Sequence, residues 1–206
     1  MDKADIIDKL QKSGEEVYNW VANQDIDRFS QGPEGKWDTS QHLDHLIGTT
    51  NAIIKGLKIP GFYLNYKFGR PNRPLRTYDE IVNRYQEKLL TIPPGMPSPI
   101  TVHKWNTNQK DQALIAFIKG NNELIKRINS YSDKKLDNRL LPHPLMGRMI
   151  IRELLMWTSY HHHHHLKILK EKVVPILTVD STFILSLGPS NFTSFLQIVS
   201  PKPIPV

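Results

Sequence analysis

Five consecutive histidines, His161 to His165, are the part of this sequence best suited to chemistry. They lie within residues 148–172, where apolar side chains recur at the spacing of an α-helix. At about 100° per residue, Leu154, Trp157, His161 and His165 fall on the same face of that helix. A run of this length contains a single i,i+4 pair, and here that pair lies at the centre of the apolar stripe.

Two imidazoles in an apolar core need partners for their ring nitrogens, because unpaired polar atoms are costly away from water. A metal ion satisfies one nitrogen on each ring. One helical turn separates His161 from His165, so both can bind the same cation, as in the His-Glu-x-x-His helix of zinc proteases. His163 points to the opposite side. We expect His162 and His164, on the flanks, to contact solvent or the ligands and not the metal.

Two simpler interpretations compete with a metal site. A purification tag would explain the run, but tags sit at termini, and this run continues the apolar pattern of a helix. Alternatively, His161 and His165 are structural residues that hydrogen-bond within the core. A structural role is the usual interpretation of a single buried histidine, but two histidines one turn apart on the same buried face make a purely structural role less favourable. A third ligand from elsewhere would weaken it further.

A second helix, predicted for residues 39–58, offers a third imidazole. Asp38, Thr39 or Ser40 can cap its start, and Pro60 follows its end. Its apolar stripe comprises Leu43, Leu46, Ile47, Thr50, Ile53, Ile54 and Leu57. His42 lies at the edge of this stripe, whereas His45 begins a second strip of small residues that another helix can approach closely. Periodicity alone does not choose between the two histidines.

The remaining periodicity predicts amphipathic helices over residues 4–23, 77–90 and 109–131. With the two histidine-bearing helices, this gives an all-α four-helix bundle with a short extra helix near 77–90 and an irregular C-terminal tail. We expect one domain over 1–172 and a poorly ordered extension over 173–206. Residues 132–144 should form a turn-rich connection in which His143, between two prolines, is a structural turn residue and not a ligand.

Residues 60–76 are rich in glycine, proline, aromatic residues and arginine, which predicts a long ordered loop. This loop leaves the helix that carries His45. We therefore expect Tyr63, Tyr66 and Arg70 to border the metal pocket.

Composition narrows the class of protein. The chain has 206 residues and no cysteine, which excludes disulfides and thiolate metal sites. Its net charge of +7 is spread along the chain, so we predict no nucleic-acid partner. No apolar run approaches the ~18 residues of a membrane span, and Met1 leads into charged residues instead of a signal peptide. We expect a cytoplasmic protein with a small-molecule substrate and no membrane partner, and a homodimer is compatible with this.

The stretches KWDTSQHLDHL and RELLMWTSYHHHHHLKIL resemble the DinB-like (YfiT-like) superfamily of metalloenzymes. The positions that carry the resemblance are Trp37, His45, Leu46, Gly147, Glu153, His161, His165 and Leu166. It covers residues 1 to about 172 and has no counterpart for the tail. The resemblance implies a four-helix bundle with a three-histidine metal site, in which His45, not His42, joins His161 and His165. Zinc, nickel and iron all suit such ligands.

Members of this superfamily include thiol-dependent S-transferases that use bacillithiol or mycothiol, a maleylpyruvate isomerase and proteins called hydrolases. No general base is evident here, because Asp44 points about 100° away from His45 and Glu153 lies at the edge of its stripe. This favours S-transfer, with a low-molecular-weight thiol as co-substrate, over hydrolysis. The alternatives are a metal-dependent hydrolase and a non-catalytic metal-binding bundle.

Overall fold

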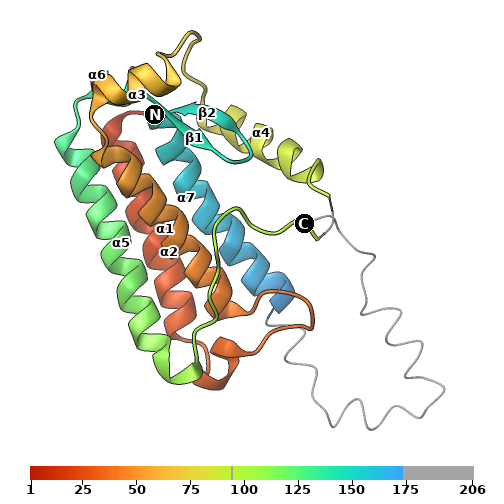
Figure 1. The fold of residues 1–206 in the computed structure, drawn as a ribbon. Coiled ribbons are helices and arrows are strands. Elements are labelled where there is room, and N and C mark those ends of the chain that lie inside the picture. The colour runs from red at the N-terminus through yellow and green to blue at the C-terminus, as the bar shows by residue number, and fades with distance from the viewer. Residues whose placement is uncertain (94, 174–206) are drawn as a thin grey trace, which may run out of the picture.

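The fold is a bundle of helices. A computed structural model describes residues 1–93 and 95–173 of the chain. Within them, the longest helices are α1 (Lys3–Ala22), α2 (Thr39–Lys58), α5 (Lys110–Ser130) and α7 (Ile151–Ile168), which form the body of the molecule in Figure 1. Helix α5 packs against α1 and α2, and α7 packs against α1. The predicted all-α four-helix bundle is therefore confirmed.

Shorter elements join the long helices. The 3₁₀ turn η1 (Ile26–Ser30) follows α1, and α3 (Gly61–Phe68) and α4 (Tyr78–Leu90) lie between α2 and α5. The 3₁₀ turn η2 (Thr107–Gln109) precedes α5, α6 (Asp133–Asp137) follows it, and the π-helical turn η3 (Leu169–Val173) follows α7. Helix α4 is the predicted extra helix. The predicted extension lies, from residue 174 onward, outside the described residues.

Helices α1, α2 and α4 begin where side chains can satisfy free backbone N–H groups. Asp38 accepts a hydrogen bond from the backbone N–H of Gln41, whose side chain in turn accepts from the backbone N–H of Asp38. Asp2 and Thr77 form the same reciprocal capping arrangement at α1 and α4. The predicted start of α2 at Thr39 and its predicted end at Lys58 are confirmed.

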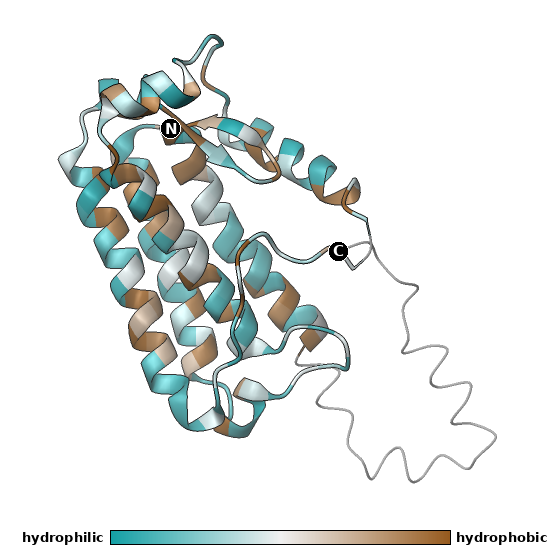
Figure 2. Cartoon of the chain, viewed as in Figure 1, coloured by the Kyte–Doolittle hydropathy of each residue, from teal (hydrophilic) through white to brown (hydrophobic). Residues whose placement is uncertain are grey.

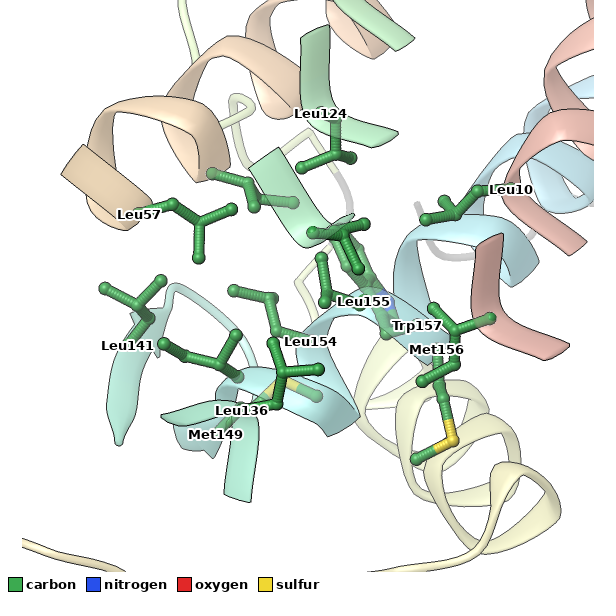
Figure 3. Close-up of a cluster of buried hydrophobic side chains, with 14 of the residues drawn as sticks. Leu10, Leu57, Leu124, Leu136, Leu141, Met149, Leu154, Leu155, Met156 and Trp157 are labelled. Carbon is green, nitrogen blue, oxygen red and sulfur yellow. The ribbon is translucent and has the colours of Figure 1, made fainter. Parts of the chain in front are cut away.

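Apolar faces of the helices meet in two buried clusters, and Figure 2 shows apolar and polar residues alternating along the helices that supply them. Figure 3 shows one cluster, which includes Leu10, Leu57, Leu124, Leu136, Leu141, Met149, Leu154, Leu155, Met156 and Trp157. The other includes Val17, Val21, Phe29, Leu43, Leu46, Ala113, Leu114, Phe117 and Leu166. On α7, the histidines occupy the stretch between Trp157 in the first cluster and Leu166 in the second. None of the described helices is long and apolar enough to cross a membrane.

The segment before α7 differs from the prediction. Residues 132–144 contain α6 and the strand β1 (Leu140–His143), which pairs antiparallel with β2 (Gly147–Ile150). Gly147 has a φ of +74°, which lets the chain turn back between the strands. The predicted helix start at Arg148 is therefore wrong, because residues 147–150 pair with β1 and α7 begins at Ile151.

The predicted position of residues 60–76 beside the metal pocket is also wrong. This segment contains α3, which packs against β1. His45 lies in the first half of α2, and Lys58, where that helix ends, is 13 residues or about 20 Å further along it. Helix α3, which carries Tyr63 and Tyr66 and ends two residues before Arg70, thus lies at the end of the bundle away from the first half of α2 (Figure 1).

Candidate metal centre

Three imidazoles from two helices converge in the bundle. Helix α2 contributes His45, which is 9% exposed, and α7 contributes His161 and His165, which are 2% and 6% exposed. The Nε2 atom of His161 lies 3.0 Å from Nε2 of His165 and 3.3 Å from Nε2 of His45. The candidate ligand atoms of the three residues all lie within 4.8 Å of one another.

The separations of 3.0 and 3.3 Å at Nε2 of His161 are those of ligands on one cation. A metal about 2.0–2.1 Å from each nitrogen, in tetrahedral or octahedral geometry, sets the nitrogens about 2.9–3.4 Å apart. Hydrogen bonds among the three rings cannot give every one of these Nε2 atoms a partner. An imidazole nitrogen offers either one N–H or one lone pair, so Nε2 of His161 can pair with only one of its two neighbours. A cation satisfies all three.

The other ring nitrogens of two ligands have partners that orient them. Nδ1 of His165 lies 2.8 Å from Nδ1 of His42, so His165 faces His161 with one nitrogen and His42 with the other. Nδ1 of His45 lies 3.4 Å from Oγ of Ser98. Both candidates on α2 are therefore at the site. His45 joins the three converging Nε2 atoms. His42 instead contacts Nδ1 of His165, the ring nitrogen that faces away from those atoms.

Burial keeps these histidines neutral. It lowers the pKa of His45 to about 4 and that of His42 to about 4, and neighbouring histidines add to both shifts. Burial also lowers the pKa of His161 and His165 well below the ordinary value. Neutral imidazole is the form that coordinates metals, so the ligands need not lose protons at neutral pH.

Aromatic rings enclose the site. The indole of Trp157 stacks on the ring of His161, with centroids 4.3 Å apart and planes 23° from parallel. The ring of Trp37 lies 5.1 Å from that of His45 and 6.5 Å from that of His165. These contacts fix the imidazole planes and limit the access of water to the converging nitrogens.

The other histidines of the run serve different purposes. His163 is exposed, with Nε2 3.2 Å from a carboxylate oxygen of Glu16, as its opposite direction predicts. His164 is half-buried on the flank. Contact with solvent, one of the two surroundings expected for His162, is wrong, because this residue is 1% exposed and its Nδ1 lies 3.0 Å from Oγ of Ser13. Helix α7 lies inside the bundle, so packing against α1 buries this flank as well as the central stripe.

His143 has the predicted structural role at the turn, although its backbone is the last residue of β1. Its Nδ1 accepts hydrogen bonds from the backbone N–H groups of Leu145 and Met146 at 3.1 and 3.0 Å. These bonds hold the tip of the β1–β2 hairpin.

An extended segment, residues 98–105, lies along α2 beside His45, and sequence reasoning missed it (Figure 1). We call it the strap. Asp44 holds it by accepting hydrogen bonds from the indole N–H of Trp105 at 2.8 Å and the backbone N–H of His103 at 2.7 Å. A Cβ at Gly48 would come within 2.7 Å of Cγ2 of Ile100, so the strap fits closely against α2 because residue 48 has no side chain.

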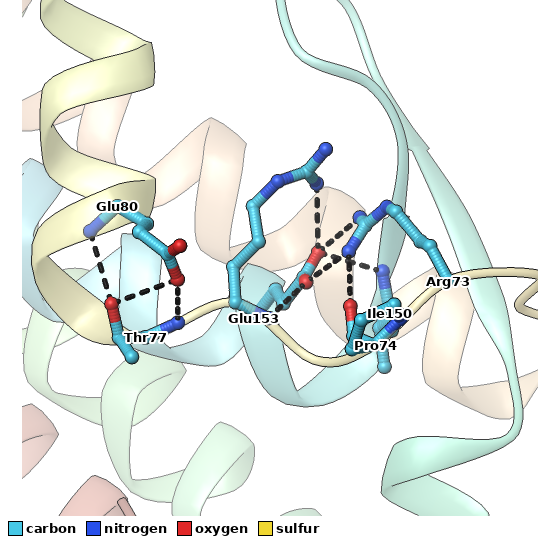
Figure 4. A network of polar contacts seen from close by, with 7 residues as sticks. Arg73, Pro74, Thr77, Glu80, Ile150 and Glu153 are labelled. Carbon is cyan, nitrogen blue, oxygen red and sulfur yellow. Dashed lines mark hydrogen bonds and ion pairs between the residues drawn. The ribbon is translucent and has the colours of Figure 1, made fainter.

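The carboxylates close in sequence to the ligands have other partners. Asp44 holds the strap. Glu153, with a fully buried side chain, accepts hydrogen bonds from both terminal nitrogens of Arg73 and from the backbone N–H of Arg76 (Figure 4). Burial raises the pKa of Glu153, but these bonds outweigh burial and hold it below its ordinary value. The expectation that neither is placed as a general base agrees with these contacts.

Comparison with known proteins bears on the family and not on the substrate. Neither the curated proteins nor the solved structures gave a significant match. A family model described as the DinB superfamily matches residues 4–169, which include the candidate metal ligands and all the bundle helices apart from the first residue of α1. The chain therefore belongs to the DinB superfamily.

Proposed function

We propose that the protein is a metal-dependent enzyme in which His45, His161 and His165 hold one divalent transition metal, and that it transfers an electrophilic group to a low-molecular-weight thiol. The observation that carries this proposal is the convergence of three buried Nε2 atoms, 3.0 and 3.3 Å apart. Membership of the DinB superfamily supports a metal site on this fold.

The donor set suits zinc, nickel or iron, because imidazole is a ligand for each. When bound, such a cation acts as a Lewis acid and lowers the pKa of a thiol or of water towards neutrality. The protein's own residues provide the orientation. His42 holds the ring of His165, and Ser98 and Trp37 contact His45.

The surroundings favour thiol transfer over hydrolysis. Hydrolysis of an ester or amide needs a base to accept a proton from water and an acid to protonate the leaving group. Asp44 and Glu153 are already engaged by Trp105 and Arg73. A thiol ionises more readily than water and needs less help from neighbouring side chains.

Metal content tests the site. The protein should be purified without a metal-affinity column, because five adjacent histidines would bind the resin, and then offered zinc, nickel and iron(II). We expect about one metal per chain in the native protein and in His163→Ala, the adjacent exposed control. His45→Ala, His161→Ala and His165→Ala should each lose most of the metal while keeping a helical circular dichroism spectrum. A native protein that holds no metal, or ligand variants that all retain it, would rule the site out.

Activity tests the reaction. Metal-loaded protein should consume an aryl halide electrophile only when a thiol is present, and the conjugate should be absent with His161→Ala. Glutathione, cysteine and bacillithiol serve as the thiols. Ester hydrolysis without thiol would instead favour the hydrolase interpretation, and a loaded protein with neither activity would favour a non-catalytic metal-binding bundle.

A further inference from the structure

A second candidate site lies at the end of the bundle away from the histidines. There, a cavity of about 400 Å³ separates the chain after α3 from the β1–β2 hairpin. Its lining residues are Phe68, Gly69, Arg70, Pro71, Asn72, Arg73, Leu140, Arg148 and Ile150. Leu140 and Ile150 are buried, whereas Arg70 and Arg148 are exposed. The cavity thus combines an apolar inner wall with guanidinium groups at its surface.

The charge around this cavity is positive. Its lining contains three arginines and neither aspartate nor glutamate. The carboxylate of Glu153 pairs with Arg73, and it also lies 3.5 Å from Arg76, so one negative charge serves two guanidinium groups (Figure 4). Burial lowers the pKa of Arg76, and the positive charge of Arg73 lowers it further. This end of the bundle therefore has unneutralised positive charge.

Two of the arginines keep donors for a ligand. Arg148 donates one hydrogen bond, from Nη1 to the backbone oxygen of Phe68 at 3.1 Å, which fixes its guanidinium between the two walls. A guanidinium has five N–H donors, so this bond leaves others available. Arg70 makes no hydrogen bond or ion pair within residues 1–93 and 95–173.

We propose that this cavity binds a small organic anion, with a carboxylate or phosphate at Arg70 and Arg148 and an apolar body against Leu140 and Ile150. Guanidinium groups form strong, charge-assisted hydrogen bonds with both kinds of anion. An apolar wall with a few polar groups is the usual composition of a small-molecule site. The proposal does not depend on the metal centre, because its residues belong to the opposite end of the fold.

Binding of simple anions to the full-length protein tests the proposal. Phenyl phosphate and benzoate are the probes, and isothermal titration calorimetry in the presence of a chelator keeps either from reaching a bound metal. We expect saturable binding of at least one probe, and the tighter of the two identifies the anionic group. Benzyl alcohol, which lacks the charge, should not bind, and inorganic phosphate, which lacks the apolar body, should bind more weakly than phenyl phosphate.

The arginines are tested with a charge-matched control. Arg70→Ala with Arg148→Ala should weaken binding about tenfold or more, because two charged donors are lost. Lys119→Ala with Lys126→Ala removes the same charge from the exposed face of α5 and should bind like the native protein. If the loss of the Arg148 bond to Phe68 unfolds the hairpin, Arg70→Ala alone should still weaken binding. No saturable binding, or equal binding in the arginine and lysine variants, would overturn the proposal.

Discussion

At the scale of single residues, His165 is the centre of the candidate site because both of its ring nitrogens have imidazole partners. Nε2 lies 3.0 Å from His161, and Nδ1 lies 2.8 Å from His42. If Nε2 of His165 binds a metal, Nδ1 of His165 carries the proton and donates a hydrogen bond to Nδ1 of His42. The ring of His165 then has one tautomer and one orientation, which lowers the cost of ordering the ligand when metal binds.

His42→Ala should therefore weaken metal binding without abolishing it. Removal of a partner that orients a ligand costs about 10–100-fold in metal affinity, whereas removal of the ligand His45 should leave little measurable binding. A competitive titration against a chelator of known affinity separates the two outcomes. His42→Asn is the control, because its side-chain oxygen can still accept the hydrogen bond and should restore part of the affinity. Loss of metal in His42→Ala but not in His45→Ala would reverse the assigned roles.

The spacing of His161 and His165 was enough to pair them, because helix geometry fixes the direction of residues four apart. Helical periodicity did not decide which of His42 and His45 is the third ligand. It gives the direction of each Cβ but not the rotation of the imidazole ring, and that rotation decides which ring nitrogen faces which neighbour. Here both histidines lie at the site, so the two interpretations differ in role and not in location.

At the scale of elements, the strap connects a surface segment to a candidate ligand. Its contacts with α2 include the two hydrogen bonds to Asp44, a third from the backbone N–H of Trp105 to Oγ of Ser40, and the contact of Ile100 at Gly48. Ser98, at its start, reaches His45. Displacement of the strap should therefore alter the orientation of one imidazole while the bundle stays folded.

Gly48→Ala should loosen the strap and stabilise the helix at the same time. A Cβ at residue 48 would lie 2.7 Å from Cγ2 of Ile100, so the side chain on the strap must move. Alanine also favours a helix by about 0.5–1 kcal/mol over glycine. We expect faster proteolytic cleavage within residues 98–105 and severalfold weaker metal binding, with an unchanged or slightly higher melting temperature.

Gly120→Ala in α5 is the matched control. Its Cβ would meet only Cγ2 of Thr50, at an ordinary 3.7 Å, so it gains the same helix propensity without touching the strap. It should raise the melting temperature and leave cleavage and metal binding as they are. Equal cleavage of the strap in both variants would show that Ile100 does not depend on the missing side chain.

The strap and the hairpin were missed in the sequence for related physical reasons. The helices were predictable because their stripes and caps are local. The strap has no period of its own, and its position is set by Asp44 and Gly48 on another element. At the hairpin, Ile150 matches the stripe of α7, but residues 147–150 pair with residues 140–143. Pairing with a distant segment overrode a local preference for helix.

At the scale of the whole molecule, the bundle buries several histidines in their neutral form. Burial lowers the pKa of His162 to about 3 and that of His143 to about 4, in addition to the four histidines at the candidate centre. In the unfolded chain these groups have a pKa of about 6.5. The unfolded state therefore binds more protons than the folded state between these values, and stability falls as the pH is lowered through that range.

The metal-free protein should thus lose stability steeply below about pH 6.5. For each buried histidine, the free energy of unfolding should fall by about 1.4 kcal/mol per pH unit until the folded-state pKa is reached. Several such groups together exceed the stability of a typical domain, so we expect acid unfolding before pH 4. Urea denaturation between pH 7.5 and 5, with a chelator present, gives the slope. Bound metal should raise the free energy of unfolding without lowering this slope, since the cation binds only the folded state and keeps its ligands free of protons.

Variants at two adjacent residues test whether the pH dependence of the free energy of unfolding comes from the burial of the histidines or only from their number. His162→Gln removes a buried titrating group and should lower the slope by about one proton, or about 1.4 kcal/mol per pH unit. His163→Gln, which removes an exposed histidine beside Glu16, is the control. If both variants change the slope equally, proton uptake comes from the five-histidine run as a charged segment and not from its burial. A slope near zero in the native protein would mean that the folded bundle already admits protons to these rings, and the neutral, metal-ready state inferred for His45, His161 and His165 would not hold.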